Sequence, residues 1–446
     1  PIAGFGGVAS GPEPLREMLE GVRGVLDSAC ASGGELTSAH INDIMALVGR
    51  CVVSGGVRRS AEICFIESTD EAGQKLKNKP LYPEENKNYR WAANHSVMCR
   101  RGDDYTRICD TTSGVSELGI AWLDNMREFS RMGRRPDNRD HRAAGANPCA
   151  EQTLEHKELC CLVEVFISRI DSLYELQRVL KYAYLYAKTV TTIPIHDAET
   201  GAIVARNRRI GCSATGIQQA ISKFGSSEFY RLCSSGYKCL KQLDERYSEW
   251  LGINRSVKLT SVKPSGTVSK LPGVSSGIHF PISSSYFQVI RFSASSPYLP
   301  ALRQAGYRVV DLDPAEPNTV AVYFGVLDSS GCRAEHEVSI WEQAEHAAKM
   351  QHYWADNQVS ITIKYKPGER DQLPHLLSMY EDRLKAVSFF PLEDHGFEHA
   401  PWQPAPELEI IDYLASLKKI DYTTTTSHEA DDEFCSGTSC LLPVKD

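Results

Sequence analysis

The sequence predicts an α/β fold, and two observations lead to that expectation. Apolar patterns of helical period alternate with short β-rich runs along most of the chain, as in α/β architectures. The 446 residues, 42% of them hydrophobic, are also enough to bury a large core. No segment approaches the roughly 20 uninterrupted apolar residues of a membrane span. Because residues 1–11 show no pattern of a secretory signal, a cytoplasmic protein is expected.

The elements follow from the local patterns. Helical periodicity predicts helices at residues 13–30, 38–53 and 172–191. Short runs rich in β-branched and aromatic residues predict strands. These strands are expected at residues 61–67, 159–166, 209–213, 257–262, 320–326, 359–365 and 385–392.

Charge and cysteine content restrict the class of function. The 49 basic and 57 acidic side chains give a formal net charge of −8, which argues against direct nucleic-acid binding. The 14 cysteines are irregularly spaced, which favours a few redox or catalytic thiols among ordinary buried ones over a disulfide scaffold. No spacing of histidines or cysteines indicates a metal site.

Residues 421–446 are expected to form a flexible redox tail behind a catalytic body of residues 1–420. The tail begins with a threonine-rich and then acidic stretch without apolar periodicity, and it ends with Cys435 and Cys440. The run of about 14 residues before Cys435, as a flexible coil, has an end-to-end distance on the order of 20 Å, enough to carry two thiols to a buried site. Two thiols are too few for a zinc site, so a dithiol that exchanges with a buried disulfide fits better.

The stretch at residues 146–166 carries the most chemistry. If its first part is extended, Asn147, Cys149 and Glu151 point to one side and line one pocket with an amide, a thiol and a carboxylate. The adjacent Cys160 and Cys161 must then face opposite sides of the next strand, so only one of them can share that pocket. Taken alone, the pattern is also compatible with a packed thiol beside a surface carboxylate.

These residues resemble the finger loop and following strand of ribonucleotide reductases. The form of the motif around Cys149 and Cys160 is most similar to the adenosylcobalamin-dependent class of monomeric ribonucleoside-triphosphate reductases, of which this chain looks like the C-terminal portion. Further segments match the family in the same order along the chain. They lie at residues 6–12, 56–62, 207–211, 354–360 and 380–385.

The resemblance implies a thiyl-radical mechanism that reduces ribonucleotides, expected to be triphosphates, to deoxyribonucleotides. Adenosylcobalamin would generate the radical on Cys149, which takes the 3′ hydrogen of the ribose. Glu151 would act as the base on the 3′ hydroxyl and Asn147 would hold the sugar. Cys160 would be one of two reducing thiols. Their disulfide would be re-reduced by the C-terminal pair Cys435 and Cys440, which a thioredoxin-like partner reduces in turn.

A glycine- and hydroxyl-rich loop follows the strand expected at residues 257–262. Ser265, Gly266 and Thr267 offer hydroxyls and backbone amides that could cradle a phosphate, although a strand-to-helix turn with a capping serine has the same composition. Similarity to the substrate-phosphate loop of the family favours the first interpretation.

The family fold is a ten-stranded α/β barrel around a central finger loop, and the resemblance implies that N-terminal strands of this barrel are missing here. We therefore expect the N-terminal half of the reductase as a separate or formerly joined chain, from a split gene or a processed precursor, that supplies the second reducing thiol and most of the site for a deoxynucleotide effector. Alternatives are a catalytically idle fragment that only binds that half, and a reductase that uses a separate radical-generating subunit. A thiol–disulfide oxidoreductase would need a Cys-x-x-Cys motif, which the sequence lacks.

Overall fold

The structure is a computed structural model that describes residues 10–54, 60–113, 117–294, 296–312, 319–328, 330–392, 399–421, 423, 435–436 and 439–440. Several segments used above lie outside the described residues. These are residues 6–9 and 56–59, which contribute to the family resemblance, and residues 424–434 of the expected linker.

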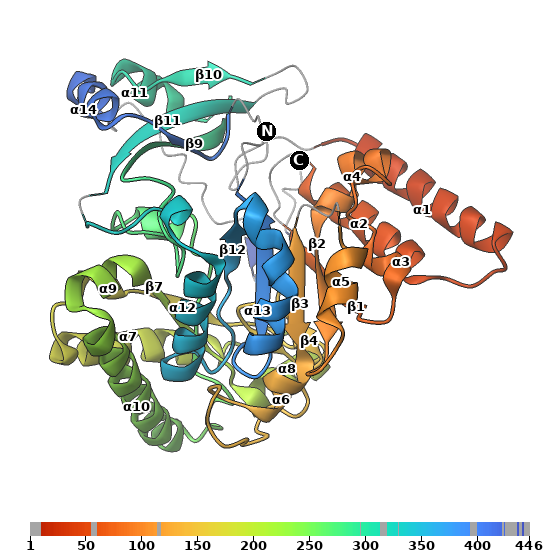
Figure 1. Ribbon diagram of the computed structural model, residues 1–446, viewed down its shortest axis with the longest axis horizontal. Coiled ribbons are helices and arrows are strands. Elements are labelled where there is room, and N and C mark those ends of the chain that lie inside the picture. The colour runs from red at the N-terminus through yellow and green to blue at the C-terminus, as the bar shows by residue number, and fades with distance from the viewer. Residues whose placement is uncertain are drawn as a thin grey trace, which may run out of the picture.

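The centre of the molecule is a five-stranded sheet built from two parts of the sequence far apart (Figure 1). Its strands, in spatial order, are β1 (Glu62–Glu67), β2 (Ala93–Cys99), β3 (Leu118–Trp122), β13 (Ala386–Pro391) and β12 (Thr362–Tyr365). Within β1-β2-β3 and within β12-β13 the strands are parallel. The two groups meet antiparallel where Ala386 of β13 pairs with Ala121 of β3.

A second, parallel sheet continues the first. It contains β6 (Leu162–Phe166), β7 (Gly211–Thr215) and β8 (Thr260–Ser261). A parallel bridge between Val262 and Val359 joins the end of β8 to the chain that leads into β12. Eight strands therefore follow one another from β6 to β1, five parallel in one direction and three in the other. Within the described residues, β6 and β1 are the free edges of this array.

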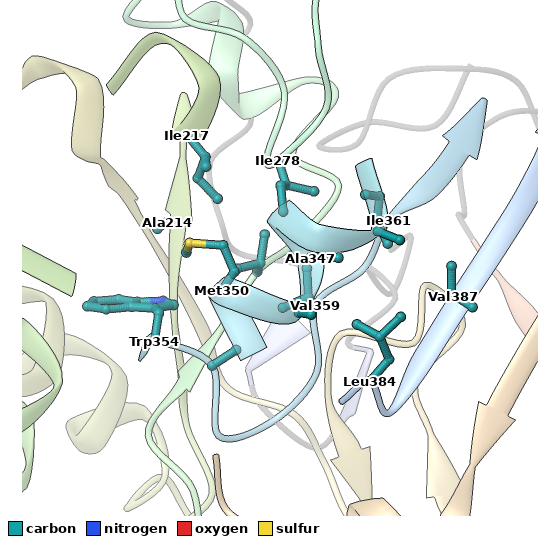
Figure 2. Packing of buried hydrophobic residues seen from close by; sticks show 14 of the residues in the cluster. Ala214, Ile217, Ile278, Ala347, Met350, Trp354, Val359, Ile361, Leu384 and Val387 are labelled. Carbon is teal, nitrogen blue, oxygen red and sulfur yellow. The ribbon is translucent and has the colours of Figure 1, made fainter. Parts of the chain in front are cut away.

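Long helices cover the parallel strands. They are α7 (Leu173–Val190), α10 (Ser226–Leu251), α12 (Ile340–Tyr353) and α13 (Leu373–Tyr380). Ser172 and Ser339 cap the first turns of α7 and α12 through their hydroxyls, as expected of serine at this position. Figure 2 shows Met350 and Trp354 lying against Ala214 of β7, so that α12 and the segment after it fill the space between the two sheets.

A separate antiparallel sheet lies above the loops of the parallel strands (Figure 1, upper left). Its order is β10 (Val309–Asp311), β11 (Thr319–Leu327), β9 (Ser285–Ser293) and β14 (Trp402–Pro404). Helices α11 (Leu299–Gln304) and α14 (Glu407–Ser416) pack on it and form two small apolar clusters distinct from the main core. This sheet supplies one wall of the cavity described below.

The N-terminal region is helical. Helices α1 (Glu13–Ala31) and α2 (Ser38–Val53) form a hairpin that projects to one side (Figure 1, right). Asp43 of α2 is paired with the buried Arg90 at 2.7 Å, which fixes the hairpin beside β2. The shorter helices are α3 (Glu71–Gln74), α4 (Pro83–Asn88), α5 (Tyr105–Thr111), α6 (Leu123–Glu128), α8 (Ala198–Asn207) and α9 (Ile217–Phe224), with 3₁₀ turns at Arg90–Ala92, Ile167–Arg169, Val268–Lys270, Glu335–Glu337 and Pro367–Gln372.

The α/β prediction is confirmed, and the three predicted helices correspond to α1, α2 and α7. All seven predicted strands are present, with ends shifted by up to three residues. The strand predicted at residues 320–326 is β11, which belongs to the antiparallel sheet and not to the parallel array. Strands β2, β3 and β9 and the long helix α10 were not predicted. No helix in the described part of the chain is both long and apolar enough to cross a membrane.

Candidate active site

A short hairpin carries the predicted thiol motif into the interior of the strand array. Its strands are β4 (Gly145–Ala146) and β5 (Thr153–Leu154). The amide of Asn147 donates to the carbonyl of Gln152 at 3.0 Å, and the amide of Ala150 donates to the carbonyl of Asn147 at 2.8 Å. Ala150 has a φ of 55°, in the left-handed region. The expectation of an extended segment is therefore wrong: a tight turn, and not strand alternation, sets the directions of Asn147, Cys149 and Glu151.

The tip of this finger hairpin is held by neighbouring strands through its carbonyl groups. The carbonyl of Glu151 accepts from the amide of Gln358 at 3.1 Å and from the hydroxyl of Ser261 at 2.8 Å. The carbonyl of Pro148 accepts from the side-chain amide of Asn94 at 2.8 Å. Sequence reasoning gave none of these three residues an anchoring role. Asn94 and Ser261 are single polar residues in strands, and Gln358 was noted only as part of the segment 354–360 that resembles the family.

Cys149 lies close enough to Glu151 for the carboxylate to affect its ionisation. The pKa of the Cys149 thiol is raised to about 11, first by burial and then by the Glu151 carboxylate, while the ammonium of Lys263 opposes both. Burial also raises the pKa of Glu151, against a hydrogen bond from Asn147 and the charge of Lys263. One carboxylate oxygen of Glu151 is buried without a partner among the described residues, so it is available to a ligand.

The two adjacent cysteines have different surroundings. Cys160 is in electrostatic range of Glu151, and burial followed by that carboxylate raises the pKa of its thiol. Cys161 packs against the main hydrophobic core, where burial raises the pKa of its thiol to about 11. Cys160 is thus the one that shares the surroundings of Cys149 and Glu151.

The predicted phosphate loop follows β8. Ser265 is buried, has a φ of 55° and donates from its hydroxyl to the carbonyl of Lys263 at 3.5 Å. Gly266 and Thr267 are exposed, and a 3₁₀ turn at Val268–Lys270 follows in place of an α-helix. The loop is backed by Gly277, where a Cβ would lie 2.3 Å from the carbonyl oxygen of Lys263.

A cavity of about 1530 Å³ lies between the strand array and the antiparallel sheet. Gly266 and Ser275 line it from the loops of the array, and Tyr286 and Trp402 line it from the antiparallel sheet. Glu117 also lines it and is in electrostatic range of Cys149, whereas Asn147, Cys149, Glu151 and Cys160 themselves do not line it. Pockets for drug-sized ligands measure about 300–1,000 Å³, so this cavity can take more than one small ligand.

The two tail cysteines lie opposite each other in a short antiparallel pair of strands. Strands β15 (Cys435–Ser436) and β16 (Ser439–Cys440) are antiparallel, and Cys435 lies opposite Cys440. The structure thus brings together Asn147, Cys149, Glu151 and Cys160. The side chains of Cys435 and Cys440 lie outside the described part of the structure, and their exchange with this group stays a prediction.

A buried ionic layer lies beneath the finger hairpin. Arg209 is fully buried and paired with Asp140 at 2.7 Å and with Glu158 at 3.0 Å. Lys258 is paired with Asp140 at 2.8 Å and also donates to the hydroxyl of Thr153 in β5. These charges therefore support the base of the finger hairpin. Within the described ranges, no cluster of three or more His, Cys, Asp or Glu side chains could hold a metal ion.

Comparison with solved structures defines the class of protein. The chain is similar to a crystal structure of B12-dependent (class II) ribonucleotide reductase, with a TM-score of 0.83 and 32% identity over 97% of this chain and 63% of that one. The fold with its central thiol-bearing finger is therefore that of a ribonucleotide reductase. No protein-family model matches the chain.

Sequence comparison identifies the family more closely. The chain is 42% identical to a probable adenosylcobalamin-dependent ribonucleoside-triphosphate reductase of Dictyostelium discoideum and 40% identical to such a reductase of Euglena gracilis, over 99% and 98% of its length. The chain belongs to the family of adenosylcobalamin-dependent ribonucleoside-triphosphate reductases. It spans 59% and 61% of the length of these two relatives. The family predicted from the motifs is thereby confirmed.

Proposed function

We propose that this chain carries the radical thiol, the base and one reducing thiol of a ribonucleoside-triphosphate reductase that uses adenosylcobalamin. One observation carries the proposal. Asn147, Cys149 and Glu151 lie at the tip of the finger hairpin, and Cys160 lies within electrostatic range of them, in a chain of this family. The relatives named above are adenosylcobalamin-dependent and act on ribonucleoside triphosphates, which supports the same cofactor and substrate here.

In this proposal each residue has one task. Cys149, as a thiyl radical, takes the hydrogen from the 3′ carbon of the ribose and returns it to the same carbon after the 2′ position has been reduced, which regenerates the radical. Glu151 accepts the proton of the 3′ hydroxyl, for which its unpaired buried oxygen is suited. Asn147 holds the sugar by hydrogen bonding. Cys160 and a second thiol from outside this chain give up two electrons and two protons, the 2′ hydroxyl leaves as water, and the two sulfurs form a disulfide.

The substrate phosphates would bind at Ser265, Gly266 and Thr267. Gly266 lines the cavity and its neighbour Thr267 is exposed, so backbone amides and a hydroxyl are accessible there. Adenosylcobalamin, when bound, supplies the radical chemistry, while the protein supplies position and exclusion of water. The cavity exceeds what one nucleotide needs, and the partly exposed apolar side chains of Ile290 and Trp402 on its antiparallel-sheet wall suit a large macrocycle.

The remaining partners follow from the free edges and the tail. A ten-stranded barrel would need two more strands between β1 and β6, whose outer edges are unpaired among the described residues. We propose that the N-terminal half of the reductase supplies them, together with the second reducing thiol and the deoxynucleotide effector site. Cys435 and Cys440 would re-reduce the active-site disulfide and be reduced in turn by a thioredoxin-like protein.

The test is reduction of CTP by this chain with adenosylcobalamin and a dithiol, with and without a co-expressed polypeptide corresponding to the part of the Euglena relative that it does not cover. Formation of dCTP with the co-expressed part is expected, and Cys149→Ser should abolish it. Cys161→Ser, which changes a thiol packed against the core, should retain activity and is the matched control.

Two results would contradict the proposal. Activity that is independent of adenosylcobalamin but requires a separate radical-generating subunit would overturn the cofactor. A folded complex that binds nucleotide without reducing it under any of these conditions would indicate a chain whose role is to bind its other half.

A further inference from the structure

A lysine lies directly after the loop that is proposed to hold the substrate phosphates. Lys270 ends the 3₁₀ turn at Val268–Lys270, and its backbone amide donates to the carbonyl of Thr267 at 3.1 Å. Its side chain lines the cavity, where its ammonium lies 5.9 Å from the centre of the Tyr286 ring in β9. Among the described residues this ammonium has neither an ion pair nor a hydrogen bond.

An unpartnered hydroxyl lies at the other end of the turn that Lys270 begins. The amide of Gly273 donates to the carbonyl of Lys270 at 3.2 Å. The amide of Val274 donates to the carbonyl of Ser269 at 3.0 Å, so the chain returns beside the start of the turn. Ser275, the next residue, is 7% exposed and lines the cavity, and its Oγ is buried without a partner among the described residues. A buried hydroxyl in this state costs free energy unless a ligand or a water completes it.

Gln219 of α9 holds this corner of the cavity together. Its side-chain oxygen accepts from the amide of Ser275 at 3.0 Å, and its side-chain nitrogen donates to a carboxylate oxygen of Asp328 at 3.1 Å. Asp328 follows β11, which pairs with β9, and it lines the cavity as well. The turn, α9 and the antiparallel sheet are therefore joined by hydrogen bonds around an ammonium and a hydroxyl that both line the cavity.

The other lysines and the arginine that line the cavity are placed differently. Arg169 and Lys223 use donor groups on backbone carbonyls of the protein. Lys364 is in β12, and its ammonium lies 4.4 Å from the centre of the Phe390 ring. Lys270 combines a place beside the phosphate loop with an ammonium that no acceptor of the described residues occupies. Such an ammonium binds a phosphate as a point charge.

We propose that the ammonium of Lys270 and the hydroxyl of Ser275 bind the terminal phosphate of a ribonucleoside triphosphate and so distinguish triphosphate from diphosphate substrates. The inference rests on the proposed function, which puts the substrate phosphates on the loop at residues 265–267. A triphosphate is one phosphate longer than a diphosphate and carries more negative charge, so a cation beyond that loop meets only the longer substrate. Lys270 determines specificity in this way and touches no reacting atom.

The experiment measures the affinities of the purified chain for CTP and for CDP by isothermal titration calorimetry, without adenosylcobalamin or reductant. The wild-type chain should bind CTP about tenfold more tightly than CDP, as expected of one charge-assisted contact. Lys270→Met should lower the affinity for CTP to that for CDP and leave the affinity for CDP unchanged. Lys270→Arg keeps the charge and should retain the preference. In the co-expressed complex of the reduction test, Lys270→Met should raise KM for CTP about tenfold at an unchanged kcat.

Two further variants separate this effect from a general disturbance. Lys238→Met removes an exposed ammonium of α10 that does not line the cavity, so both affinities should stay unchanged. Asp328→Asn removes a negative charge from the same corner and keeps an acceptor oxygen for Gln219, so the affinity for CTP should rise more than that for CDP. This direction is opposite to that of Lys270→Met, and loss of structure would not produce it.

An unchanged ratio of the two affinities in Lys270→Met would overturn the inference, and so would a wild-type chain that does not prefer CTP. Weaker binding of CTP in Asp328→Asn would also overturn it, and this variant decides the question if Lys270→Met does not fold. Because binding needs neither cofactor nor radical chemistry, a failed reduction assay leaves a measured preference for CTP standing. A complex that reduces CTP but binds CTP and CDP equally would refute this inference and leave the reductase proposal standing.

Discussion

Replacing Asp140 by Asn tests how strongly the buried ionic layer supports the finger hairpin. The Asp140 carboxylate accepts two hydrogen bonds from Arg209, at 2.7 and 2.8 Å, and is paired with Lys258 at 2.8 Å. Its side chain is 4% exposed and that of Arg209 is fully buried. These two cations outweigh the effect of burial and hold the pKa of Asp140 well below its usual range.

The expected loss of unfolding free energy follows from the buried charges that lose their partner in this variant. Removing one partner of a buried ion pair costs about 3–5 kcal/mol of unfolding free energy, because the remaining charge stays desolvated. Asn keeps the volume and one acceptor oxygen, and Arg209 keeps Glu158, so a loss of about 3 kcal/mol is expected. Since the folded pKa of Asp140 is depressed, its contribution is complete above the unfolded pKa near 3.9 and is lost as the pH falls.

The assay is urea unfolding at pH 7, pH 4 and pH 3, followed by circular dichroism. Asp140→Asn should lower the midpoint at pH 7 and weaken the loss of stability between pH 4 and pH 3, below the unfolded pKa of the carboxyl. Glu228→Gln, which breaks the solvent-exposed pair with Arg231 on α10, should leave the midpoint unchanged. A loss below about 1 kcal/mol in Asp140→Asn, or one no larger than in the control, would refute the argument that this layer is a desolvated ion pair.

Two further predictions concern the loops around the cavity. Burial lowers the pKa of His279 to about 4, and its ring accepts from the amide of Thr362 at 3.0 Å in the neutral form. Because the unfolded state binds the proton more readily, the wild-type protein should lose about 2 kcal/mol of stability between pH 7 and pH 5, and urea titrations of His279→Gln should show a smaller loss. Gly277→Ala places a Cβ 2.3 Å from the carbonyl oxygen of Lys263 at a φ of 56°, so thermal unfolding should show a loss of about 1–3 kcal/mol. Gly24→Ala, which meets no atom within 4 Å on α1, should be neutral or stabilising, and an equal effect of the two substitutions would contradict the steric argument.

Elements with a strong local pattern could be predicted from the sequence. Helix α2 has its predicted bounds because an apolar stripe begins directly after Thr37, whose side chain caps the first turn. Strands β2 and β3 were missed because Ala93–Cys99 and Leu118–Trp122 are short and show no clear alternation; their neighbours β1 and β13 determine them. Nothing local distinguishes β11, in the antiparallel sheet, from a strand of the parallel array.

In the candidate site, too, some features have a local sequence signal and others depend on the fold. The motif predicted which side chains meet at Cys149, but the turn at Ala150 that makes them meet is left-handed at an alanine, which no propensity favours. Arg209 has no signal of its own in the sequence, and only the fold shows that its partners Asp140 and Glu158 are buried with it. Lys263 likewise has no signal beyond its place before the loop.

The antiparallel junction between β3 and β13 has a consequence for biosynthesis. Ala121 pairs with Ala386, roughly 265 positions later, so β3 leaves the ribosome long before its partner exists. At about 5–20 residues per second, its edge waits for tens of seconds during translation. A strand edge that stays unpaired for this long can pair with strands of other nascent chains. Contacts between residues so distant in sequence also slow folding. Yield of folded protein should therefore depend on chaperones and on growth temperature more than on the stability of the finished fold.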